Sequence, residues 1–371
     1  MKATAPLPKH RQIYTSLRRD IQSGRLGDGA RLPSEAELVR RFGASRITVG
    51  RAMRDLQAAG LVDRRVGSGS YVRGVGTHAG HSFGLLIPDL GETEIFEAIC
   101  QGMMGSPLAS QHALVWGSLS GGASEPGARE DQAWRMCRQY IERRVSGVFF
   151  APLEQTPHHH DVNRRIVDAL DEARIPVVLL DRPALPYPQR GHHDLVGIDN
   201  RRAGYVSTEH LIGLGARHVA FVAMPESAAT VDAREAGYRE ALYAAGLEID
   251  RRLARRLDPA DPAAVRSLMT SAAPDGIVCA NDRTAARLMP ALLRLGVRIP
   301  QVVRMVGIDD VDYAALLPVP LTTLRQPTAA IGETALRVML ERVERADLPG
   351  RDVLLHCELI VRESCGGSAS R

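Results

Sequence analysis

Residues 196–222 read VGIDNRRAGYVSTEHLIGLGARHVAFV. Two short apolar runs, VGID at the start and HVAFV at the end, flank a helix-like segment over Arg201–Leu214. A buried strand, a helix and a second buried strand form the unit that places neighbouring strands parallel in one sheet. This stretch therefore predicts an α/β fold built on parallel sheets.

The same alternation continues along most of the chain from Phe83 onward. The other apolar runs are FGLLIPDL, HALVWGSL, SGVFFAPL, IPVVLLDR, DGIVCAND and VVRMVGIDD, and further helix-like segments cover Arg129–Arg144, Asp161–Ala173 and Ala233–Ala245. Eight or more strands over about 290 residues fit two doubly wound lobes better than one sheet. We expect a two-lobed domain over 83–364, with an N-lobe over about 83–193 and 325–350 and a C-lobe over about 194–324 and 351–364.

Polar residues close many of these apolar runs. The positions are Pro88-Asp89, Pro152, Asp181-Arg182, Asp199-Asn200, Asn281-Asp282 and Asp309-Asp310. Ligands of open α/β sheets bind beyond the carboxyl ends of the strands, so these groups should line a cleft. For any one position, a cap on the following helix is an alternative that stays open. Six positions in series, with two arginines, favour a polar small-molecule site.

A different pattern occupies the start of the chain, where residues 42–53 read FGASRITVGRAM. Apolar residues at helical spacing predict one buried stripe, formed by Val49, Ala52, Met53 and Leu56. Ser45 is a suitable N-cap, whereas Arg51 and Arg54 point away from the stripe. For an isolated helix, a solvated basic face would be the simpler interpretation.

The neighbouring segments favour nucleic-acid binding for this helix. Ser34 and Glu37 form a predicted capping box, and Ile13, Leu17 and Ile21 predict one more amphipathic helix. Two short strands around Gly67 complete a winged helix-turn-helix over residues 1–73, followed by a linker over 74–82. In that geometry the helix start enters the major groove of DNA and the wing lies along the backbone. The residues so placed are Ser45, Arg46 and Thr48 on the helix, and Arg64, Arg65 and Gly67 in the wing.

The distribution of charge agrees with a DNA-binding segment at the start of the chain. Residues 1–75 carry 15 lysines and arginines against 6 acidic residues, a net charge of +9, and the remaining residues carry −5, which gives +4 for the chain. A basic segment on a mildly acidic body is the electrostatic footprint of a nucleic-acid-binding module. Arginine dominates over lysine along the whole chain, so that bias is not specific to DNA binding.

The composition of the chain indicates in which cellular compartment we expect the protein. The five cysteines are odd in number and widely spaced, and no CxxC pair occurs, so we expect reduced thiols and a cytoplasmic location. The first residues, MKATAPLPKHRQ, contain no apolar segment typical of a signal peptide. No apolar run approaches the roughly 20 residues of a membrane span.

Residues 7–73 resemble the DNA-binding domain of GntR-family transcription regulators. The resemblance is carried by LPSEAEL and FGASRITVGRAMRDLQAAGLVDRRVGSGSYV. It implies DNA contact by Arg31, Ser45, Arg46, Thr48 and Gly67, and we add Ser34, Arg51, Arg54 and Arg65 as candidates. Gly50 departs from the family pattern, in which many members have Arg or Asn, and a glycine there should weaken the helix by about 1 kcal/mol relative to alanine.

Residues 82–364 resemble the effector domain of LacI/GalR regulators, which is related to periplasmic sugar-binding proteins. The motifs are IPVVLLDR, VGIDNRRAGYVSTEHLIGLGARHVAFV, REAGYREAL, GIVCANDRTA and MVGIDDVDYAALLPVPLTTLRQP. A GntR-type head on such a body is the arrangement of an arabinose-repressor-like subgroup. The resemblance implies effector contact by Arg182, Asp199, Arg234, Asn281, Asp309 and Gln326, with Phe96 and Glu154 as further candidates. The segment RRLDPADPAAV lacks the aromatic residue with which several sugar-binding members stack on the sugar ring.

These patterns predict a ligand-responsive transcription regulator, acting as a repressor on a palindromic operator as a homodimer. A sugar is the first expectation for the effector, and a non-sugar metabolite is the alternative. An enzyme is a weaker alternative, because no P-loop, GxGxxG helix start, GxSxG or CxxC is present. We therefore expect no catalytic residue and no cofactor.

Two runs of histidine raise the possibility of a bound metal. They are His158 to His160 and the pair His192 and His193. Adjacent histidines are expected to point in different directions, and the sequence shows no second ligand cluster at suitable spacing. We therefore expect no metal site in either run.

Overall fold

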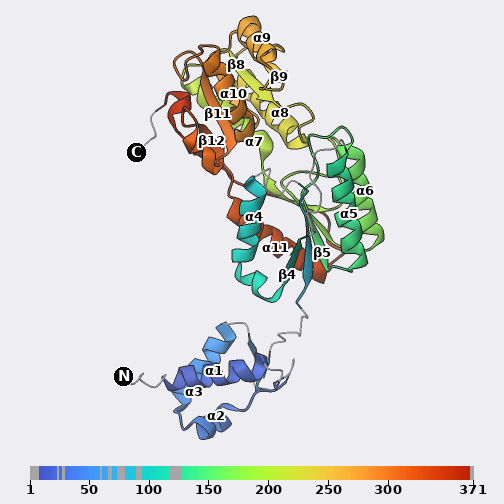
Figure 1. Cartoon of the computed structure of the whole chain (residues 1–371). Coiled ribbons are helices and arrows are strands. Elements are labelled where there is room, and N and C mark those ends of the chain that lie inside the picture. Colours follow the sequence, from blue (N-terminus) through green and yellow to red (C-terminus); the bar gives the residue numbers. More distant parts are fainter. Residues whose placement is uncertain are drawn as a thin grey trace, which may run out of the picture. The chain divides into compact units, whose positions relative to one another are not determined.

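The computed structural model describes residues 8–22, 25–26, 30–58, 61–65, 69–72, 80–88, 94–116 and 127–367. The chain forms two compact units, Met1–His81 and Ser82–Arg371 (Figure 1). Each unit has its own buried apolar core, and each is described by itself below.

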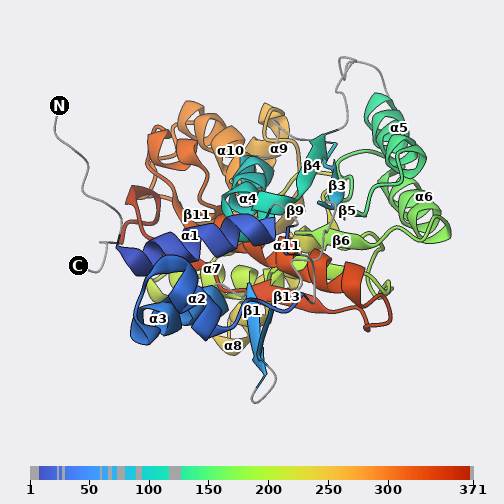
Figure 2. The same cartoon turned by 90° about the horizontal axis from the view of Figure 1, so that it is seen from below.

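The first unit is a winged helix-turn-helix. Helices α1 (Lys9–Gln22), α2 (Glu35–Phe42) and α3 (Arg46–Ala58) pack together, and the antiparallel hairpin β1 (Val62–Arg65) and β2 (Gly69–Val72) projects from them (Figure 2). The core contains the residues whose spacing predicted these helices, namely Ile13, Leu17, Ile21, Leu38, Val49, Ala52, Met53 and Leu56. The outward face of α3 is exposed, as predicted.

Local capping fixes where these helices begin and end. The Ser34 side chain accepts from the backbone N–H of Glu37, and the Glu37 carboxylate accepts from that of Ser34 at 2.7 Å, which is the predicted capping box. Gly43 ends α2 with φ of 55°, a left-handed conformation that glycine adopts without strain. Ser45 caps α3, because its hydroxyl accepts from the N–H of Thr48 at 3.2 Å.

The second unit holds two lobes, each built on one six-stranded sheet. The first sheet is entirely parallel, with the order β13-β7-β6-β5-β3-β4. Its strands are β3 (Ser82–Leu86), β4 (Ala113–Trp116), β5 (Gly147–Phe150), β6 (Val177–Leu180), β7 (Asp194–Ile198) and β13 (Asp352–Leu355). Helices α4 (Glu94–Gly105) and α11 (Thr328–Glu344) cover one face, and α5 (Ala128–Glu142) and α6 (His159–Glu172) cover the other (Figure 1). A short 3-10 helix, Pro107–Gln111, precedes β4.

The second sheet has the order β14-β12-β11-β10-β8-β9, in which only β14 is antiparallel. Its strands are β8 (Val219–Ala223), β9 (Ala254–Arg256), β10 (Gly276–Cys279), β11 (Arg304–Asp309), β12 (Thr322–Arg325) and β14 (Glu358–Ile360). The helices of this lobe are α7 (Asn200–Gly213), α8 (Ala229–Ala244), α9 (Pro262–Ala272) and α10 (Asp282–Arg294). Two 3-10 helices, Asp312–Leu316 and Glu363–Cys365, lie in the same lobe.

The chain passes between the two lobes three times, and this corrects the predicted lobe boundaries. Residues 194–198 and 352–355 were predicted in the C-lobe, but as β7 and β13 they pair with each other in the first sheet. The passages are therefore β7 to α7, β12 to α11, and β13 to β14. A buried apolar strand has the same residue pattern in either sheet, so its pattern does not reveal to which lobe it belongs.

Helices α7 and α8 pack backbone against backbone in the second lobe. A Cβ atom on Gly204 would lie 1.9 Å from the carbonyl oxygen of Arg234, and one on Gly237 would lie 1.8 Å from that of Arg201. Only glycine permits this approach at both positions. The close packing sets the position of Arg234, which begins the second turn of α8 and belongs to the site described below.

Two further findings bear on the cellular setting. All five cysteines are free thiols, and four of them are buried. Among the described residues, no helix combines the length and the apolar character that a membrane span requires.

Candidate effector cleft and nucleic-acid interface

The first lobe contributes a buried arginine to the predicted cleft. Arg182 follows β6, and its Nη1 lies 2.6 Å from Oε1 of Glu154, which follows the adjacent strand β5. Its guanidinium carbon lies 5.1 Å from the ring centre of Phe96 on α4. Parallel neighbouring strands end at the same edge, so the fold brings these three predicted residues together. The guanidinium plane is thereby held between a carboxylate and an aromatic ring.

The second lobe contributes Arg234, which is 3% exposed. Its Nε donates to Oδ1 of Asn200 at 2.8 Å, and its Nη1 donates to the carbonyl of Ala280 at 2.6 Å. Its Nη2 lies 3.7 Å from Oδ1 of Asp309, close enough for an ion pair but long for a hydrogen bond. Arg234 is therefore held largely by its own lobe, with one end of the guanidinium directed toward Asp309.

Asp309 and Gln326 meet at the ends of neighbouring strands β11 and β12. The Nε2 group of Gln326 donates to Oδ1 of Asp309 at 2.7 Å. Burial raises the pKa of Asp309 to about 8; the Arg234 guanidinium offsets only part of this rise, and the nearby carboxylate of Asp282 adds to it. The Asp309 carboxyl group can therefore gain or lose its proton near neutral pH.

Two hydrogen bonds join the lobes beside these charges. The N–H of Ala228, just before α8, donates to Oε2 of Glu154 at 3.0 Å, and the N–H of Gln155 donates to the carbonyl of Glu226 at 2.6 Å. Burial by itself raises the pKa of Glu154, but the Arg182 guanidinium and the Ala228 amide outweigh burial, so that pKa is lowered. Glu154 is thus a charged link between Arg182 in one lobe and the backbone of the other.

The backbone at these strand ends adopts an uncommon conformation. Five non-glycine residues there have positive φ: Gln155 (58°), Asp181 (66°), Glu226 (53°), Asp309 (134°) and Asp310 (57°). Such conformations cost about 1–3 kcal/mol each and concentrate at functional sites. Of the eight such non-glycine residues in the described part of the chain, these five lie at strand ends and loops of both lobes.

Two buried acceptors at the site lack a hydrogen-bond partner among the described residues. They are Oδ1 of Asp181 and Oε1 of Gln326, on side chains that are 4% and 3% exposed. A buried acceptor without a donor costs about 1–3 kcal/mol. Hydroxyl groups of a ligand would satisfy both atoms, because each hydroxyl carries one donor.

A cavity of about 400 Å³ lies between the lobes beside Asp309 and Gln326. Helix α4 lines it on the first-lobe side through Ile95, Ala98 and Gln101, and residues 309–313 line it on the second-lobe side. Its volume falls within the range of about 300–1,000 Å³ that is usual for small-molecule sites. Of the predicted effector residues, Asp309 and Gln326 line this cavity.

Two of the predicted effector residues serve as helix caps. Oδ1 of Asp199 accepts from the N–H of Arg202 at 2.9 Å, and Oδ1 of Asn281 accepts from that of Thr284 at 2.8 Å. The side chain of Asp199 is exposed and lines a different cavity, of about 510 Å³, beside Cys357. Capping was the alternative left open for these positions, and the structure shows that both residues do cap helices.

Two other residues belong to the site but were not among the candidates. Asn200 binds Arg234, and Asp181 presents the unpaired acceptor described above. Both stand in the strand-end pairs of the sequence, next to the candidates Asp199 and Arg182. The strand-end pattern located them, but it did not show that both Asp181 and Arg182 are buried in the site, whereas Asn200 is buried and Asp199 is exposed.

In the first unit, most candidate DNA-binding residues lie on α3 and its N-terminus. Ser45, Arg46, Arg51 and Arg54 are exposed, Thr48 is partly exposed, and Ile47 beside them is 81% exposed. The Ser45 and Thr48 hydroxyls also bond each other at 2.8 Å. Free backbone N–H groups and a cation at one helix start suit a phosphate anion.

The remaining DNA-binding candidates lie around the wing. Arg31 pairs with Tyr71 of β2, and its Nε would lie 3.0 Å from a Cβ on Gly69, so this arginine lies against the hairpin. Ser34 is exposed and uses its side chain in the capping box of α2. Gly67 and the side chain of Arg65 fall outside the described residues.

The two histidine runs behave differently from each other. His159 is buried and its Nδ1 lies against the carbonyl of Thr156, while the His160 ring packs against that of His159. In contrast, His192 and His193 both direct Nε2 at Asp171. The expectation that adjacent histidines point apart is wrong for both pairs, since the ring centres lie 4.0 Å apart for His159 and His160 and 4.2 Å apart for His192 and His193. The second pair lies in a loop over residues 191–193 that imposes neither helical nor strand periodicity.

Both parts of the chain match known protein families. Residues 9–72 match the bacterial regulatory proteins of the gntR family, and residues 208–365 match the periplasmic binding protein-like domain. The chain therefore joins a GntR-family DNA-binding domain to a periplasmic binding protein-like domain.

Individual relatives are transcription regulators. The HTH-type transcriptional regulator CelR of Thermobifida fusca is 34% identical over 200 residues, which cover 53% of this chain and 58% of CelR, so the match spans less than two thirds of that protein. The arabinose metabolism transcriptional repressor of Geobacillus stearothermophilus is 24% identical over 375 residues, which cover 96% of this chain and 98% of that repressor. The solved structure of a transcriptional regulator CelR–cellobiose complex aligns with a TM-score of 0.64 at 26% identity, over 86% of this chain and 91% of that one.

Proposed function

We propose that this protein is a transcription regulator that represses its target genes in the cytoplasm and responds to a small polar effector. A homodimer binds a palindromic DNA operator through the winged helix, and the cleft between the lobes binds the effector, for which a sugar is the first candidate. The cleft has a sensing rather than a catalytic role. The observation that carries this proposal is the group of buried polar residues at the strand ends of both lobes, within a chain that also carries a DNA-binding domain.

The chemistry of the cleft suits a ligand rich in hydroxyl groups. Asp181 and Gln326 offer buried acceptors, and the guanidinium groups of Arg182 and Arg234 offer planar donors. The relatives point in the same direction, since one is a repressor of arabinose metabolism and another was solved with cellobiose. We propose Phe96, Glu154, Arg182, Arg234, Asp309 and Gln326 as effector contacts, with Asp199 and Asn281 placing the helices that border the site.

The response follows from thermodynamic linkage between two binding sites. An effector that prefers one arrangement of the lobes shifts the population toward that arrangement. If the two arrangements hold the paired DNA-binding domains differently, DNA affinity changes by the same coupling free energy, which is typically about 1–3 kcal/mol. The hydrogen bonds of Glu154 and Gln155 to the second lobe are contacts that such a change would make or break.

The test combines an effector screen with DNA binding. A panel of pentoses, hexoses, disaccharides and their phosphates is screened by thermal shift, because a tight ligand raises the unfolding midpoint by mass action. Operator fragments selected from random DNA are then titrated with and without each hit. We expect one class of polar ligand to raise the midpoint and to change operator affinity about 5- to 150-fold.

A variant of the cleft tests whether the effector binds there or at another surface of the protein. Gln326→Leu removes the buried acceptor at similar size, and Gln189→Leu makes the same change at an exposed position of the first lobe. Loss of the thermal shift in Gln326→Leu alone supports the cleft. A ligand that binds both variants equally, or a protein that selects no DNA, contradicts the proposal.

A further inference from the structure

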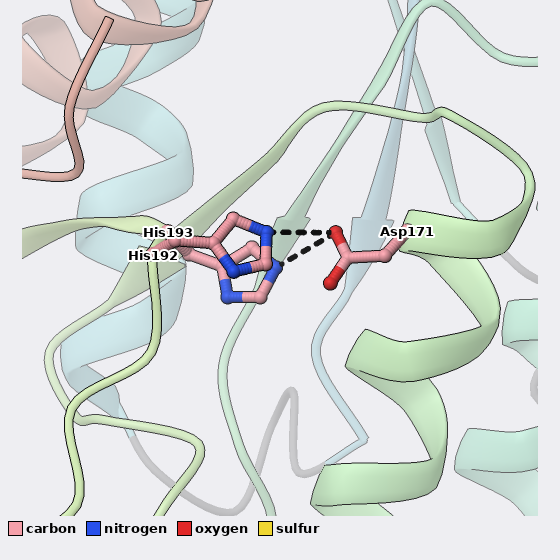
Figure 3. Close-up of side chains that lie close together, drawn as sticks. All are labelled: Asp171, His192 and His193. Carbon is pink, nitrogen blue, oxygen red and sulfur yellow. Dashed lines mark hydrogen bonds and ion pairs between the residues drawn. The ribbon is translucent and has the colours of Figure 1, made fainter.

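Two imidazoles and one carboxylate converge at the edge of the first sheet where its strands begin (Figure 3). Asp171 lies in the last turn of α6, and His192 and His193 directly precede β7. Oδ1 of Asp171 lies 3.3 Å from Nε2 of His192 and 3.1 Å from Nε2 of His193, and one ligand atom from each residue lies within 4.8 Å of the others. The effector cleft lies beyond the opposite ends of these strands, so this cluster is a separate site.

Two of the three separations among these ligand atoms are close to those in the coordination sphere of a small metal ion. Zinc binds imidazole nitrogen and carboxylate oxygen at about 2.0–2.2 Å in tetrahedral geometry, which separates two ligand atoms by about 3.3–3.5 Å. The observed separations of 3.1 and 3.3 Å need only a slight expansion to reach that value. We propose that Asp171, His192 and His193 bind one divalent first-row transition metal ion per chain, with Zn²⁺ as the ion of choice.

The loop before β7 and helix α6 hold the three ligands in place. The residue after His193 is Asp194, which is fully buried and accepts from Nε and Nη2 of Arg342 at 3.0 and 2.8 Å. It also accepts from the backbone N–H of Arg351 at 3.0 Å. The histidine-bearing loop is therefore anchored at its end, and Asp171 is carried by a regular helix. Such support lowers the conformational entropy that ordering the ligands would cost.

The electrostatic surroundings favour a cation. The C-terminal end of α6 carries the negative end of the helix dipole, and Asp171 lies in that last turn. Asp168, one turn earlier, lines the same cavity of about 390 Å³ as the three ligands. Two arginines also line this cavity, and their partners lie in its wall: Arg190 bonds Asp352 at 2.6 Å and Arg164 bonds Gln189 at 2.8 Å. With Asp168, Asp171 and Asp352, the cavity carries three carboxylates against these two guanidinium groups.

Three protein ligands leave one coordination position for water or a second ligand. Closed structural zinc sites have four protein ligands, whereas sites with three leave one position available. Here that position would adjoin the cavity, whose other walls include Pro183, Leu185 and Tyr187 of the loop before the histidines. The ion would thus tie this loop to α6 and stabilise the first lobe.

Metal binding is tested on the full-length chain after treatment with a chelator. Zn²⁺ affinity is measured by competition with a chromophoric chelator, and Co²⁺ is added separately to follow the visible absorption of a tetrahedral site. We expect one ion per chain, a higher unfolding midpoint with Zn²⁺, and weak or no binding of Mg²⁺. His192→Ala should weaken Zn²⁺ binding by at least about 100-fold, since even residues that only support metal ligands change affinity 10- to 100-fold.

Two ligand variants and one control variant test whether these three residues bind the metal. The His192 side chain is 74% exposed, so its removal should leave the fold intact, and Asp171→Asn provides a second ligand variant. His160→Ala is the matched control, because it removes an exposed histidine from the other end of the same helix. The proposal is overturned if no Zn²⁺ binds, if both ligand variants bind like the parent, or if binding is lost only in His160→Ala. In the first two outcomes the three residues form only a hydrogen-bonded group.

Discussion

Glu154 and Arg182 form a buried ion pair of 2.6 Å in the first lobe, and the second oxygen of Glu154 accepts a hydrogen bond from Ala228 in the other lobe. One carboxylate therefore holds the arginine of the cleft and connects the two lobes. Any change in the separation of the lobes must break or remake the bond to Ala228. We therefore propose that Glu154 couples effector binding to lobe movement.

Glu154→Gln should uncouple the effector from the DNA response. Glutamine can still accept from the Ala228 N–H, but it cannot balance the charge of Arg182, whose Nε also lies 3.4 Å from Oδ2 of Asp181. Loss of one carboxylate partner of a buried charge pair costs up to about 2–5 kcal/mol. We expect effector affinity to fall at least about tenfold, a lower unfolding midpoint, and operator affinity without effector within about twofold of the parent. Isothermal titration and fluorescence anisotropy measure the two affinities.

Glu142→Gln is the control for that substitution, because Glu142 is an exposed residue at the end of α5 in the same lobe. It should leave both affinities unchanged. An effector response in Glu154→Gln equal to that of the parent would show that this carboxylate takes no part in sensing.

Gly204→Ala should disrupt the packing of α7 against α8. The added Cβ would lie 1.9 Å from the carbonyl oxygen of Arg234, and a backbone atom cannot give way as the tip of a flexible side chain can. Overpacking of this kind costs about 1–3 kcal/mol, and here it would also displace Arg234 from Asn200. We expect a lower unfolding midpoint together with weaker effector binding. Gly213→Ala in the same helix is the control, because nothing lies within 4 Å of its Cβ, and a loss of stability there would count against the packing argument.

The sequence predicted those features that depend on residues close together in the chain or at the ends of adjacent strands. Ser34 and Glu37 of the capping box are three positions apart in the chain, and the strand-end residues Arg182 and Glu154 meet because adjacent parallel strands must end at one edge. The lobe assignment of β7 and β13 was wrong, since it depends on pairing between segments far apart in the chain. The contact of His192 and His193 with Asp171 was missed for a related reason: the loop over residues 181–193 has no period from which side-chain directions can be read.

Limited proteolysis should separate the chain into two stable parts. We propose a DNA-binding domain over 1–73, a linker over 74–82 and an effector domain that ends near residue 364. The segment RGVGTHAGHS at residues 73–82 is small and polar, without an apolar period, and such segments are preferred sites of cleavage. Mass spectrometry of the fragments should place the first cut between Arg73 and Ser82. A first cut within the sheets of the second unit would contradict this boundary.

Arg46→Ala should abolish specific operator binding without unfolding the domain. Arg46 is exposed in the first turn of α3, where it can reach phosphates or base edges. Losing a base-reading arginine costs about 1–3 kcal/mol per half-site, so a dimer should lose about 2–6 kcal/mol. Footprinting and anisotropy measure the loss.

Arg18→Ala removes the same charge from the exposed side of α1 and serves as the control for Arg46→Ala. It should weaken binding to all DNA sequences to the same small extent, if at all. Equal footprints for Arg46→Ala and Arg18→Ala would place the recognition surface elsewhere.

Asp309 should make the stability of the effector domain depend on pH. Because burial raises its pKa to about 8, the folded state keeps a proton that the unfolded chain releases above about pH 4. The free energy of unfolding is then greatest below about pH 4. It falls as the pH rises from about 4 toward 8, and it changes little above about pH 8. Burial raises the pKa of Asp282 to about 6, so this carboxyl group also lowers the stability as the pH rises, but over a narrower pH range. The unfolding midpoint should decrease by several degrees between about pH 5 and pH 8.

Asp309→Asn distinguishes a structural carboxyl group from an effector contact. The amide stays neutral, so the part of the pH dependence above about pH 6 should disappear, whereas Asp312→Asn, at an exposed position three residues on, should keep it. If Asp309 also accepts a hydrogen bond from the effector, Asn should weaken effector binding most at high pH, where the parent carboxylate is charged. Loss of the pH dependence with unchanged effector affinity from pH 6 to pH 9 would leave Asp309 a purely structural partner of Arg234 and Gln326.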